Sequence, residues 1–326
     1  MTRVAVAGLG WWGPNLARNF DDLAELVWLC DLDATLLDRF SRRHPQARLT
    51  TSFDDPVADP SVEAVVIATP VVTHYELARQ ALAAGKHVFV EKPMALHAGE
   101  AEELCALAEE RELVLMPGHL LLYHPAVKKL KELTDSGELG EIRYVYGNRR
   151  NLGKFRTDEN ALGSLGAHDL SVILHLVGEE PSEVWARGES YVNPPVEDVV
   201  FCYLRFPSGK IAHMHLSWLD PHKIREMTVV GSKKMAVFDD MELERKITVY
   251  DKGEERPPLG TYGEWRTRSG DIYVPKVPND EPLRLECEHF LRLVRGNGDV
   301  LAAARDGVAV VRALEQLQHS LERAPA

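Results

Sequence analysis

A glycine-rich turn near the start of the chain constrains the fold more than any other feature. The residues from Gly8 to Gly13 read Gly-Leu-Gly-Trp-Trp-Gly and directly follow the apolar run at 4–7. A GxGxxG spacing between a strand and a helix is the fingerprint of a dinucleotide-binding turn. Gly8, Gly10 and Gly13 permit a tight turn, close approach of the backbone to a pyrophosphate, and close helix–strand packing. The N-terminus of the following helix offers free N–H groups to the phosphates.

An acidic residue, Asp31, ends the second predicted strand at the distance from the glycines that this fingerprint requires. A carboxylate there hydrogen-bonds the adenosine ribose hydroxyls and repels a 2′-phosphate, so the sequence predicts NAD in preference to NADP. Trp11 and Trp12, within the turn, are expected to contact the cofactor. The alternative is that Asp31 caps the helix beginning near Ala34 and that the glycines serve packing alone.

Short apolar runs alternate with helical patterns through the first third of the chain, which predicts parallel strands with right-handed crossovers. We therefore expect an α/β fold with a doubly wound parallel Rossmann sheet in a domain covering residues 1–122. The predicted strands are 4–7, 26–30, 64–68, 88–90 and 113–116, and the predicted helices are 15–23, 34–43, 75–84 and 99–111.

Beyond residue 122, consecutive period-two segments replace this alternation, so a second, α+β domain with an open, mainly antiparallel sheet is expected over residues 123–326. The stretch 251–280 is rich in Gly, Pro and charge and is interpreted as a long loop. The predicted strands are 142–148, 183–191, 198–206, 210–218, 224–230 and 235–239, followed by helices at 281–295 and 300–322.

Composition narrows the possible partners. The net charge of -12 argues against a nucleic-acid partner, which normally requires a basic face. No apolar run is long enough to span a membrane, and strand-like residues begin immediately after Arg3, so we expect a cytoplasmic protein without a membrane partner. The cysteines, Cys30, Cys105, Cys202 and Cys287, form no CxxC pair and are expected to be free thiols, with no metal site.

Three further motifs give a resemblance to a known family. Glu91-Lys92-Pro93 follows the apolar strand 88–90, Ala68-Thr69-Pro70 precedes it, and a histidine-bearing helical segment lies at 163–178. With the glycine turn, these motifs make the whole chain resemble the glucose–fructose oxidoreductase/inositol dehydrogenase (Gfo/Idh/MocA) family. The resemblance implies an NAD(P)-dependent dehydrogenase acting on CH–OH groups, assembled as a homodimer or homotetramer. It implies further cofactor contacts at Thr69, Pro70, His74, Glu91, Lys92 and His119.

The resemblance assigns catalysis to Lys92, beside the nicotinamide and the reacting carbinol. Oxidation of an alcohol needs a group that accepts the hydroxyl proton while hydride leaves, and a desolvated lysine can do this near neutral pH. The alternative for Lys92 is a solvated surface charge.

His168 is the second expected catalytic residue, as a ligand of the substrate hydroxyl or a proton-transfer partner. Many family members carry a D-x-x-x-H pair here, with both side chains on one helix face. In this chain Ser164 takes the place of the aspartate, and we expect it in the substrate site. The alternative for His168 is packing in a gap between domains.

The segment from Asn148 to His168 resembles a branch of the family that oxidises UDP-N-acetylhexosamines or their uronates at C3. Arg149, Arg150, Lys154 and Arg156 suit a phosphate-bearing substrate, although a solvated loop face remains an alternative. Tyr123 is expected in the substrate site, and a hinge packing residue is the alternative for both Tyr123 and His119. Two other functions stay open: a free sugar or inositol dehydrogenase, and a non-catalytic NAD sensor. The expected substrate-binding residues are Lys92, Tyr123, Asn148, Arg149, Arg156, Ser164 and His168.

Overall fold

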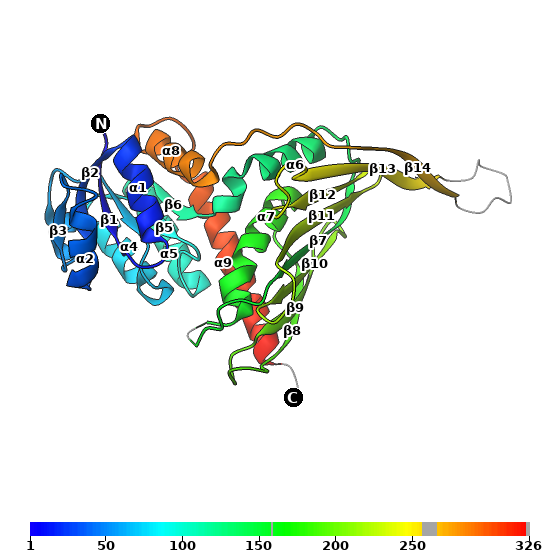
Figure 1. Cartoon of the computed structure of the whole chain (residues 1–326), viewed down its shortest axis with the longest axis horizontal. Coiled ribbons are helices and arrows are strands. Elements are labelled where there is room, and N and C mark those ends of the chain that lie inside the picture. Colours follow the sequence, from blue (N-terminus) through cyan, green and yellow to red (C-terminus); the bar gives the residue numbers. More distant parts are fainter. Residues whose placement is uncertain (158, 256–265, 324–326) are drawn as a thin grey trace. The chain divides into compact units, whose positions relative to one another are not determined.

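The computed structural model describes residues 1–157, 159–255 and 266–323, and these form two compact units (Figure 1). The first unit contains Met1–Tyr123 together with Asp280–Glu315. The second contains His124–Asn279 and the chain from Gln316 onward.

The first unit is built on a six-stranded parallel sheet of order β3-β2-β1-β4-β5-β6, which confirms the predicted Rossmann sheet. Its central strands are buried on both faces, as crossover helices require. The strands are β1 (Arg3–Ala7), β2 (Glu25–Cys30), β3 (Arg48–Thr50), β4 (Ala64–Ile67), β5 (His87–Glu91) and β6 (Leu115–Gly118).

Alternate residues of these strands enter two apolar cores, one on each face of the sheet. Val4 and Val6 join the core formed with α1, α2 and α8, whereas Ala5 joins the core formed with α4, α5 and α9. This division is the doubly wound arrangement that the alternating pattern predicts. The helices are α1 (Gly13–Leu23), α2 (Ala34–Ser41), α3 (Asp54–Ala58), α4 (His74–Ala83), α5 (Ala98–Glu110), α8 (Pro282–Val294) and α9 (Ala302–Glu322).

The predicted domain division is wrong for one segment, because Asp280–Glu315 belongs to the first unit and not to the second. Phe290 of α8 packs edge-on against Phe20 of α1 and Phe89 of β5, with ring centroids 6.0 and 5.7 Å apart. Burying one such side chain contributes roughly 1.5–3 kcal/mol. The apolar face of α8 therefore attaches this late segment to the N-terminal sheet.

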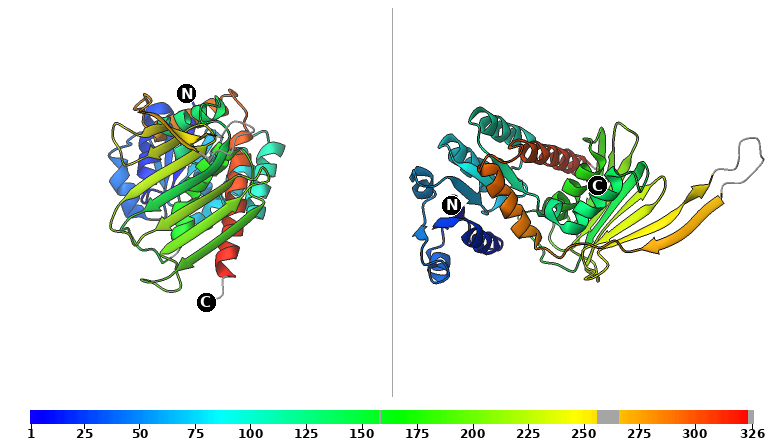
Figure 2. Two further views of the ribbon diagram at one scale, coloured as in Figure 1. Left: turned by 90° about the vertical axis from the view of Figure 1, so that its right-hand side faces the viewer. Right: turned by 90° about the horizontal axis from the view of Figure 1, so that it is seen from above.

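The second unit contains an eight-stranded sheet of order β14-β13-β12-β11-β7-β10-β9-β8. Its pairs are antiparallel except for β7 with β10, so the predicted mainly antiparallel sheet is confirmed. Helices α6 (Pro125–Asp135) and α7 (Ala167–Val177) lie on one face of the sheet, and the opposite face is open (Figure 2). The strands are β7 (Ile142–Arg150), β8 (Glu183–Glu189), β9 (Val199–Arg205), β10 (Ile211–Ser217), β11 (Ile224–Gly231), β12 (Met235–Asp239), β13 (Ile247–Glu255) and β14 (Arg266–Tyr273).

The expected long loop at 251–280 is wrong in part, since β13 and β14 form an antiparallel ribbon that enters this stretch. Residues 256–265 lie outside the described residues. The ribbon is at the edge of the sheet and carries many charged side chains, including an Asp251–Arg268 ion pair. Charged edge strands are common because charge discourages pairing with other chains, and their polarity conceals the apolar alternation on which strand prediction depends.

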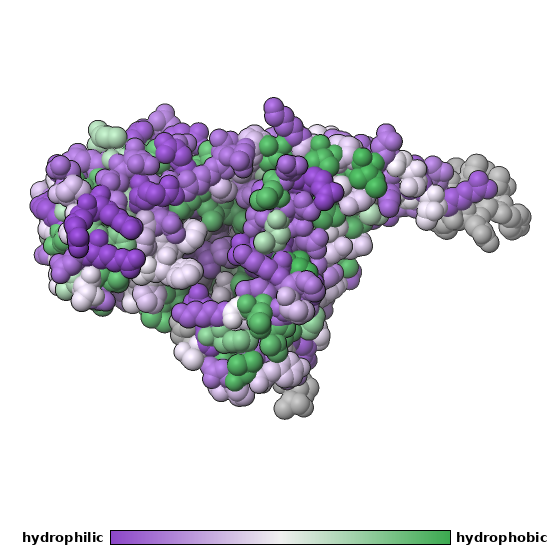
Figure 3. Space-filling view, in the orientation of Figure 1, coloured by the Kyte–Doolittle hydropathy of each residue, from purple (hydrophilic) through white to green (hydrophobic). Residues whose placement is uncertain are grey.

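The surface and the cysteines add two observations. Among the described residues, no helix is both long and apolar enough to cross a membrane. Hydrophilic residues cover most of the visible face of the first unit (Figure 3). All four cysteines are free thiols, and Cys30, Cys202 and Cys287 are buried.

Candidate active site

The three glycines of the turn differ in what surrounds them. Gly8 has φ +91°, and a Cβ there would lie 2.6 Å from the carbonyl group of Ala68. A Cβ on Gly13 would lie 1.8 Å from the carbonyl oxygen of Gly8. A Cβ on Gly10, in contrast, would meet no atom within 4 Å. Packing within the protein therefore explains Gly8 and Gly13 but not Gly10.

Asp31 connects the end of β2 to the glycine turn. Its Oδ2 accepts a hydrogen bond from the backbone N–H of Leu9 at 2.6 Å, and its Oδ1 accepts one from the N–H of Asp33 at 2.9 Å. The cap of α2 is Asp33, whose Oδ1 accepts from the N–H of Thr35, so the alternative of Asp31 as the helix cap is wrong. An ionised carboxylate has about four acceptor sites, which leaves capacity for ribose hydroxyls.

His74 links the two loops that carry the ATP and EKP motifs. Its Nδ1 lies 2.8 Å from the carbonyl oxygen of Pro93, and its Nε2 lies 2.8 Å from that of Thr69. The ring is buried, and this burial lowers the pKa of His74. Both ring nitrogens face backbone carbonyl oxygens of these loops, and cofactor binding by His74 stays a prediction. Thr69 also contacts Thr73, with their hydroxyl oxygens 2.7 Å apart, and Pro70 is exposed in the same turn.

Lys92 follows β5, and its peptide bond to Pro93 is cis. The neighbouring Glu91 accepts a hydrogen bond from the backbone N–H of Lys92 at 3.2 Å and another from the side chain of Trp12. Desolvation raises the pKa of Glu91 to about 7, against the opposing effect of the Lys92 charge. Trp12 thus connects the glycine turn to β5, whereas the Trp11 side chain is 91% exposed.

His119 lies just beyond β6 and is buried, with no hydrogen-bond partner for either ring nitrogen among the described residues. Burial, reinforced by the Lys92 charge, lowers the pKa of His119 to about 4. The imidazole is therefore neutral at physiological pH. A buried polar group without a partner is unusual and points to a ligand that supplies one.

These residues fit a dinucleotide at the carboxyl ends of the parallel strands, where Rossmann sheets bind their ligands. Gly10 leaves room for a pyrophosphate beside the backbone, Asp31 offers acceptors to the ribose, and His119 offers a donor and an acceptor near Lys92. No three or more His, Cys, Asp or Glu side chains in the described ranges are grouped so as to hold a metal ion.

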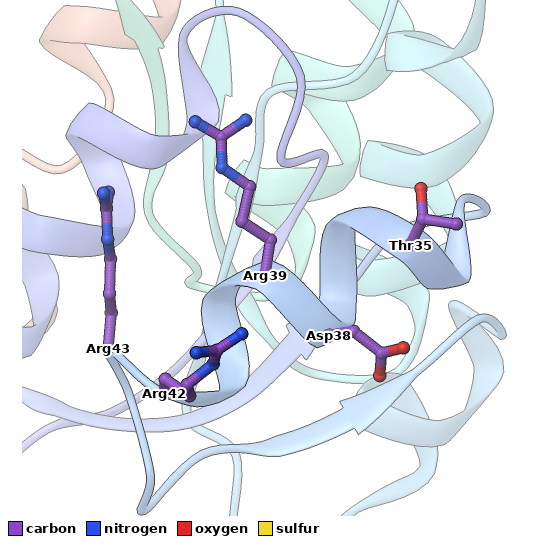
Figure 4. Close-up of a pocket in the computed structure, with 5 residues that line it drawn as sticks. All are labelled: Thr35, Asp38, Arg39, Arg42 and Arg43. Carbon is purple, nitrogen blue, oxygen red and sulfur yellow. The ribbon is translucent and has the colours of Figure 1, made fainter.

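A pocket on α2 and the turn after it contains three arginines (Figure 4). It is lined by Thr35, Asp38, Arg39, Arg42 and Arg43. Arg43 lies over the ring of Phe40, 5.8 Å from its centroid, and the three guanidinium groups are exposed. The pocket does not include Asp31.

In the second unit, the predicted histidine helix begins with a π-helical turn. This turn, η3 (Leu162–Gly166), contains the buried Ser164, and α7 then carries the partly buried His168. The wider π turn alters the i, i+4 relation that a continuous α-helix would give Ser164 and His168. Single π turns are frequent at functional sites, so the local backbone supports a functional segment here.

Arg149 is not available to a substrate, which corrects its predicted role. Its side chain is buried between β7 and α7, where Nη2 lies 2.6 Å from Oδ1 of Asp169. Burial raises the pKa of Asp169, and the Arg149 charge opposes this shift. The ion pair therefore belongs to the core between sheet and helix.

The predicted basic cluster is wrong as a single patch, because strand alternation separates its members. Arg150 lies on the open face of the sheet and pairs with Asp220 at 2.9 Å, and Asn148 lies on that same face, away from α7. Arg156 forms an ion pair with Glu159. Asn148 therefore lies on the face of the sheet away from α7, Arg156 has a carboxylate partner within its own loop, and their substrate roles stay predictions.

Tyr123 has a partner within the first unit. Tyr123 lies in the short helix η2 (Leu120–Tyr123), and its hydroxyl is 2.6 Å from Nδ1 of His289 on α8. Burial raises the pKa of Tyr123. This geometry favours the alternative of a hinge packing residue, and a substrate contact by Tyr123 stays a prediction.

Sequence reasoning missed one buried acid, Glu286. It occupies the apolar stripe of α8 formed by Leu283, Cys287 and Phe290. A charged residue at a core position of an amphipathic helix contradicts the local pattern, and such contradictions mark functional or strained sites. That contradiction was the available signal.

The Rossmann sheet, the glycine turn and the residues around Lys92 define an NAD-binding oxidoreductase. The family model for "Oxidoreductase family, NAD-binding Rossmann fold" matches residues 2–119, and the model for the GFO/IDH/MocA C-terminal domain matches residues 127–237. The chain therefore belongs to the Gfo/Idh/MocA family, and it is an NAD-dependent enzyme acting on CH–OH groups.

Three relatives illustrate the range of substrates. UDP-N-acetylglucosamine 3-dehydrogenase of Acidithiobacillus ferrooxidans is 29% identical over 98% of this chain and 97% of its own, and its solved structure matches with a TM-score of 0.83. GenD2 from gentamicin A biosynthesis, solved in complex with NAD, is 28% identical over 99% and 94% of the two chains, with a TM-score of 0.80. A scyllo-inositol 2-dehydrogenase (NAD(+)) of Bacillus subtilis is 26% identical over 90% and 86%.

Proposed function

We propose that this enzyme oxidises a nucleotide-linked sugar, with a UDP-N-acetylhexosamine or its uronate losing hydride from C3 to NAD. The nicotinamide supplies the hydride acceptor. Lys92 accepts the hydroxyl proton, and His168 holds the substrate hydroxyl or exchanges its proton. Ser164 belongs to the same substrate segment.

The observation that carries the redox assignment is the placement of Lys92 and His119 directly after the neighbouring parallel strands β5 and β6, at their carboxyl ends. The Lys92 charge acts on a neutral, buried imidazole that has polar atoms to offer a ligand. Ligands of doubly wound sheets bind at these strand ends. A non-catalytic NAD sensor has no need of a lysine in this position, which favours the enzyme.

Support for the nucleotide sugar is the match to UDP-N-acetylglucosamine 3-dehydrogenase over 98% of the chain. The basic segment no longer supports it, because Arg149, Arg150 and Arg156 each have a carboxylate partner. A free sugar or inositol therefore remains the second candidate, favoured by the match to the inositol dehydrogenase.

A substrate panel tests the proposal. NADH formation is followed with UDP-N-acetylglucosamine, UDP-N-acetylgalactosamine and their uronates, and with free hexoses and inositols. We expect kcat/KM for one UDP-sugar to exceed that for every free polyol by about tenfold or more, a difference of about 1.4 kcal/mol. A free polyol that equals or exceeds every UDP-sugar transfers the proposal to the second candidate.

We further propose a homodimer or homotetramer formed through the open face of the second sheet. Aromatic and histidine side chains stack across this face, with Tyr146 5.1 Å from His213 and Phe201 4.3 Å from His215 between ring centroids. Phe201 is 49% exposed and Trp185 is 44% exposed. Exposed apolar patches of this kind typically mark interaction surfaces. We also propose a cytoplasmic location, since four free thiols are typical of a reducing compartment.

A further inference from the structure

Glu286 of α8 is a fully buried carboxyl group whose burial the fold alone does not explain. Its side chain is 0% exposed, and neither carboxyl oxygen accepts a hydrogen bond from a donor in the part of the chain that the structure describes. An isolated buried carboxylate is so costly that the group binds a proton instead. Accordingly, desolvation raises the pKa of Glu286 well above its ordinary value, and the nearby Glu91 charge adds to the effect.

The packing of α8 on the sheet brings Glu286 toward Glu91. Phe89 and Glu91 are two residues apart on β5 and so share one face of the sheet, and Phe89 contacts Phe290 of α8. Glu286 lies one helical turn before Phe290 on the same buried stripe of α8.

The direction of α8 completes this geometry. Arg295, just after α8, donates to the hydroxyl of Thr2 at 3.4 Å, which places the C-terminal end of the helix beside the start of β1. The helix therefore runs antiparallel to the strands, with its N-terminal end toward their carboxyl ends. Two strand residues advance about 6.6 Å and four helix residues about 6 Å, so Glu286 reaches the level of Glu91.

Glu91 is the residue that connects Glu286 to the site. Its carboxylate accepts from the backbone of Lys92 and the side chain of Trp12, and the Lys92 charge stabilises its ionised form. Gly118, the neighbour of Glu91 on the adjacent strand β6, lies against its carboxylate, since a Cβ there would be 3.1 Å from Glu91 Oε1. Glu91 is thus packed between the glycine turn, β6 and α8.

We propose that Glu286 carries a proton, donates it in a hydrogen bond to Glu91, and thereby holds the Glu91 carboxylate, the counter-charge of Lys92, in place. Glu286 is a positioning residue in this arrangement, acting on Lys92 through Glu91. The inference rests on the proposed role of Lys92 as proton acceptor.

Other charged and titratable groups also face this cluster, and the experiments must keep them constant. Burial and the charge of Asp306 on α9 raise the pKa of Tyr123 in η2, and burial and the charge of Lys92 lower the pKa of His119. The neighbours on the same helix are Cys287, His289 and Arg292, and the charge of Arg18 on α1 opposes the raised pKa of Cys287.

Infrared difference spectra between the wild type and each variant, recorded without added substrate, test the protonation of Glu286 directly. At pH 8 the wild type should show a C=O stretching band of a buried, protonated carboxylic acid, and Glu286→Gln should lack it. Glu91→Gln should retain the band. Absence of the band from the wild type, or its persistence in Glu286→Gln, overturns the proposal.

Trace acetylation of Lys92, quantified by mass spectrometry as a function of pH, tests the positioning effect without any turnover. In Glu286→Leu, Glu91 loses its donor and binds a proton more readily, so Lys92 loses its counter-charge. We expect the titration midpoint of Lys92 to fall by about one pH unit. In Glu286→Gln, the amide can still donate to Glu91, and the midpoint should stay near that of the wild type.

Phe290→Leu is the matched control, because it disturbs the same buried face without altering the carboxyl pair. It should lower stability and leave the Lys92 midpoint unchanged. A purely structural Glu286 predicts the same midpoint in the wild type and in Glu286→Leu, and that result contradicts the proposal. Should Glu286→Leu not fold, the infrared comparison of wild type with Glu286→Gln decides. Retained turnover in Lys92→Met would instead defeat the proposed function and leave both measurements valid.

Discussion

Arg149 and Asp169 form an ion pair between β7 and α7, with Nη2 and Oδ1 2.6 Å apart and both side chains buried. Their burial means that each charge depends on the other for stabilisation, because neither has access to solvent.

Asp169→Asn should therefore destabilise the second unit strongly, since it leaves the Arg149 guanidinium buried without its counter-charge. We expect the free energy of unfolding to fall by about 3–5 kcal/mol, measured by urea denaturation. Arg150→Ala is the control: its pair with Asp220 is partly exposed, and its loss should cost about 1 kcal/mol or less. Equal effects of the two substitutions would refute a core role for Arg149.

Two substitutions in the glycine turn should affect folding and NAD binding separately. Gly10→Ala should fold with the stability of the wild type, because a Cβ there meets no atom within 4 Å, but should weaken NAD binding by about tenfold or more as the methyl group occupies the pyrophosphate's space. Gly13→Ala should instead disrupt folding, since its Cβ would lie 1.8 Å from the Gly8 carbonyl oxygen. Calorimetric NAD titrations and thermal unfolding give the two readouts. Unchanged NAD affinity in Gly10→Ala would show that the turn does not hold the pyrophosphate.

The buried His119 makes stability depend on pH. Its pKa is lowered to about 4 in the folded chain, so between pH 4 and 6.5 the unfolded chain binds the extra proton and stability rises with pH. At pH 5 this costs the wild type on the order of 2 kcal/mol relative to neutral pH. His119→Leu removes this contribution.

Denaturation of wild type and His119→Leu at pH 5 and pH 7.5 checks this expectation. The variant should lose less stability on acidification than the wild type. The raised pKa of Glu91 acts in the opposite direction, with stability falling as pH rises through about 7, but it is common to both proteins and cancels in the comparison. The same pH dependence in both proteins would contradict a buried, neutral His119.

The first unit followed from the sequence because its strands and helices have clear periods. Val4, Val6 and Ala5 alternate between two cores, and the glycine turn locates the start of α1. The β13–β14 ribbon did not follow, since its charged residues at the sheet edge carry no apolar alternation. The attachment of α8 to the first unit depends on contacts between Phe20, Phe89 and Phe290, which are distant in sequence.

The positions of candidate site residues were predictable where a motif fixes them, as for Asp31 after β2 and Lys92 after β5. The basic residues could not be placed from a count of charges, because such a count ignores the direction in which each side chain points. Period two along β7 puts Arg149 on the side of Val145 and Gly147, and Arg150 on the other, so the basic residues could not form one patch. Glu286 carries its own signal in the sequence, because its carboxyl group falls within the apolar stripe of α8.

The central claim is that Lys92 accepts the substrate proton in an NAD-dependent oxidation. The most direct test is kcat for NADH formation by Lys92→Met, with the best substrate from the panel, alongside NAD affinity measured by calorimetry. We predict that kcat falls by roughly 100- to 10,000-fold while NAD affinity stays within about threefold of the wild type. A Lys92→Met enzyme that keeps half the wild-type kcat would contradict the account.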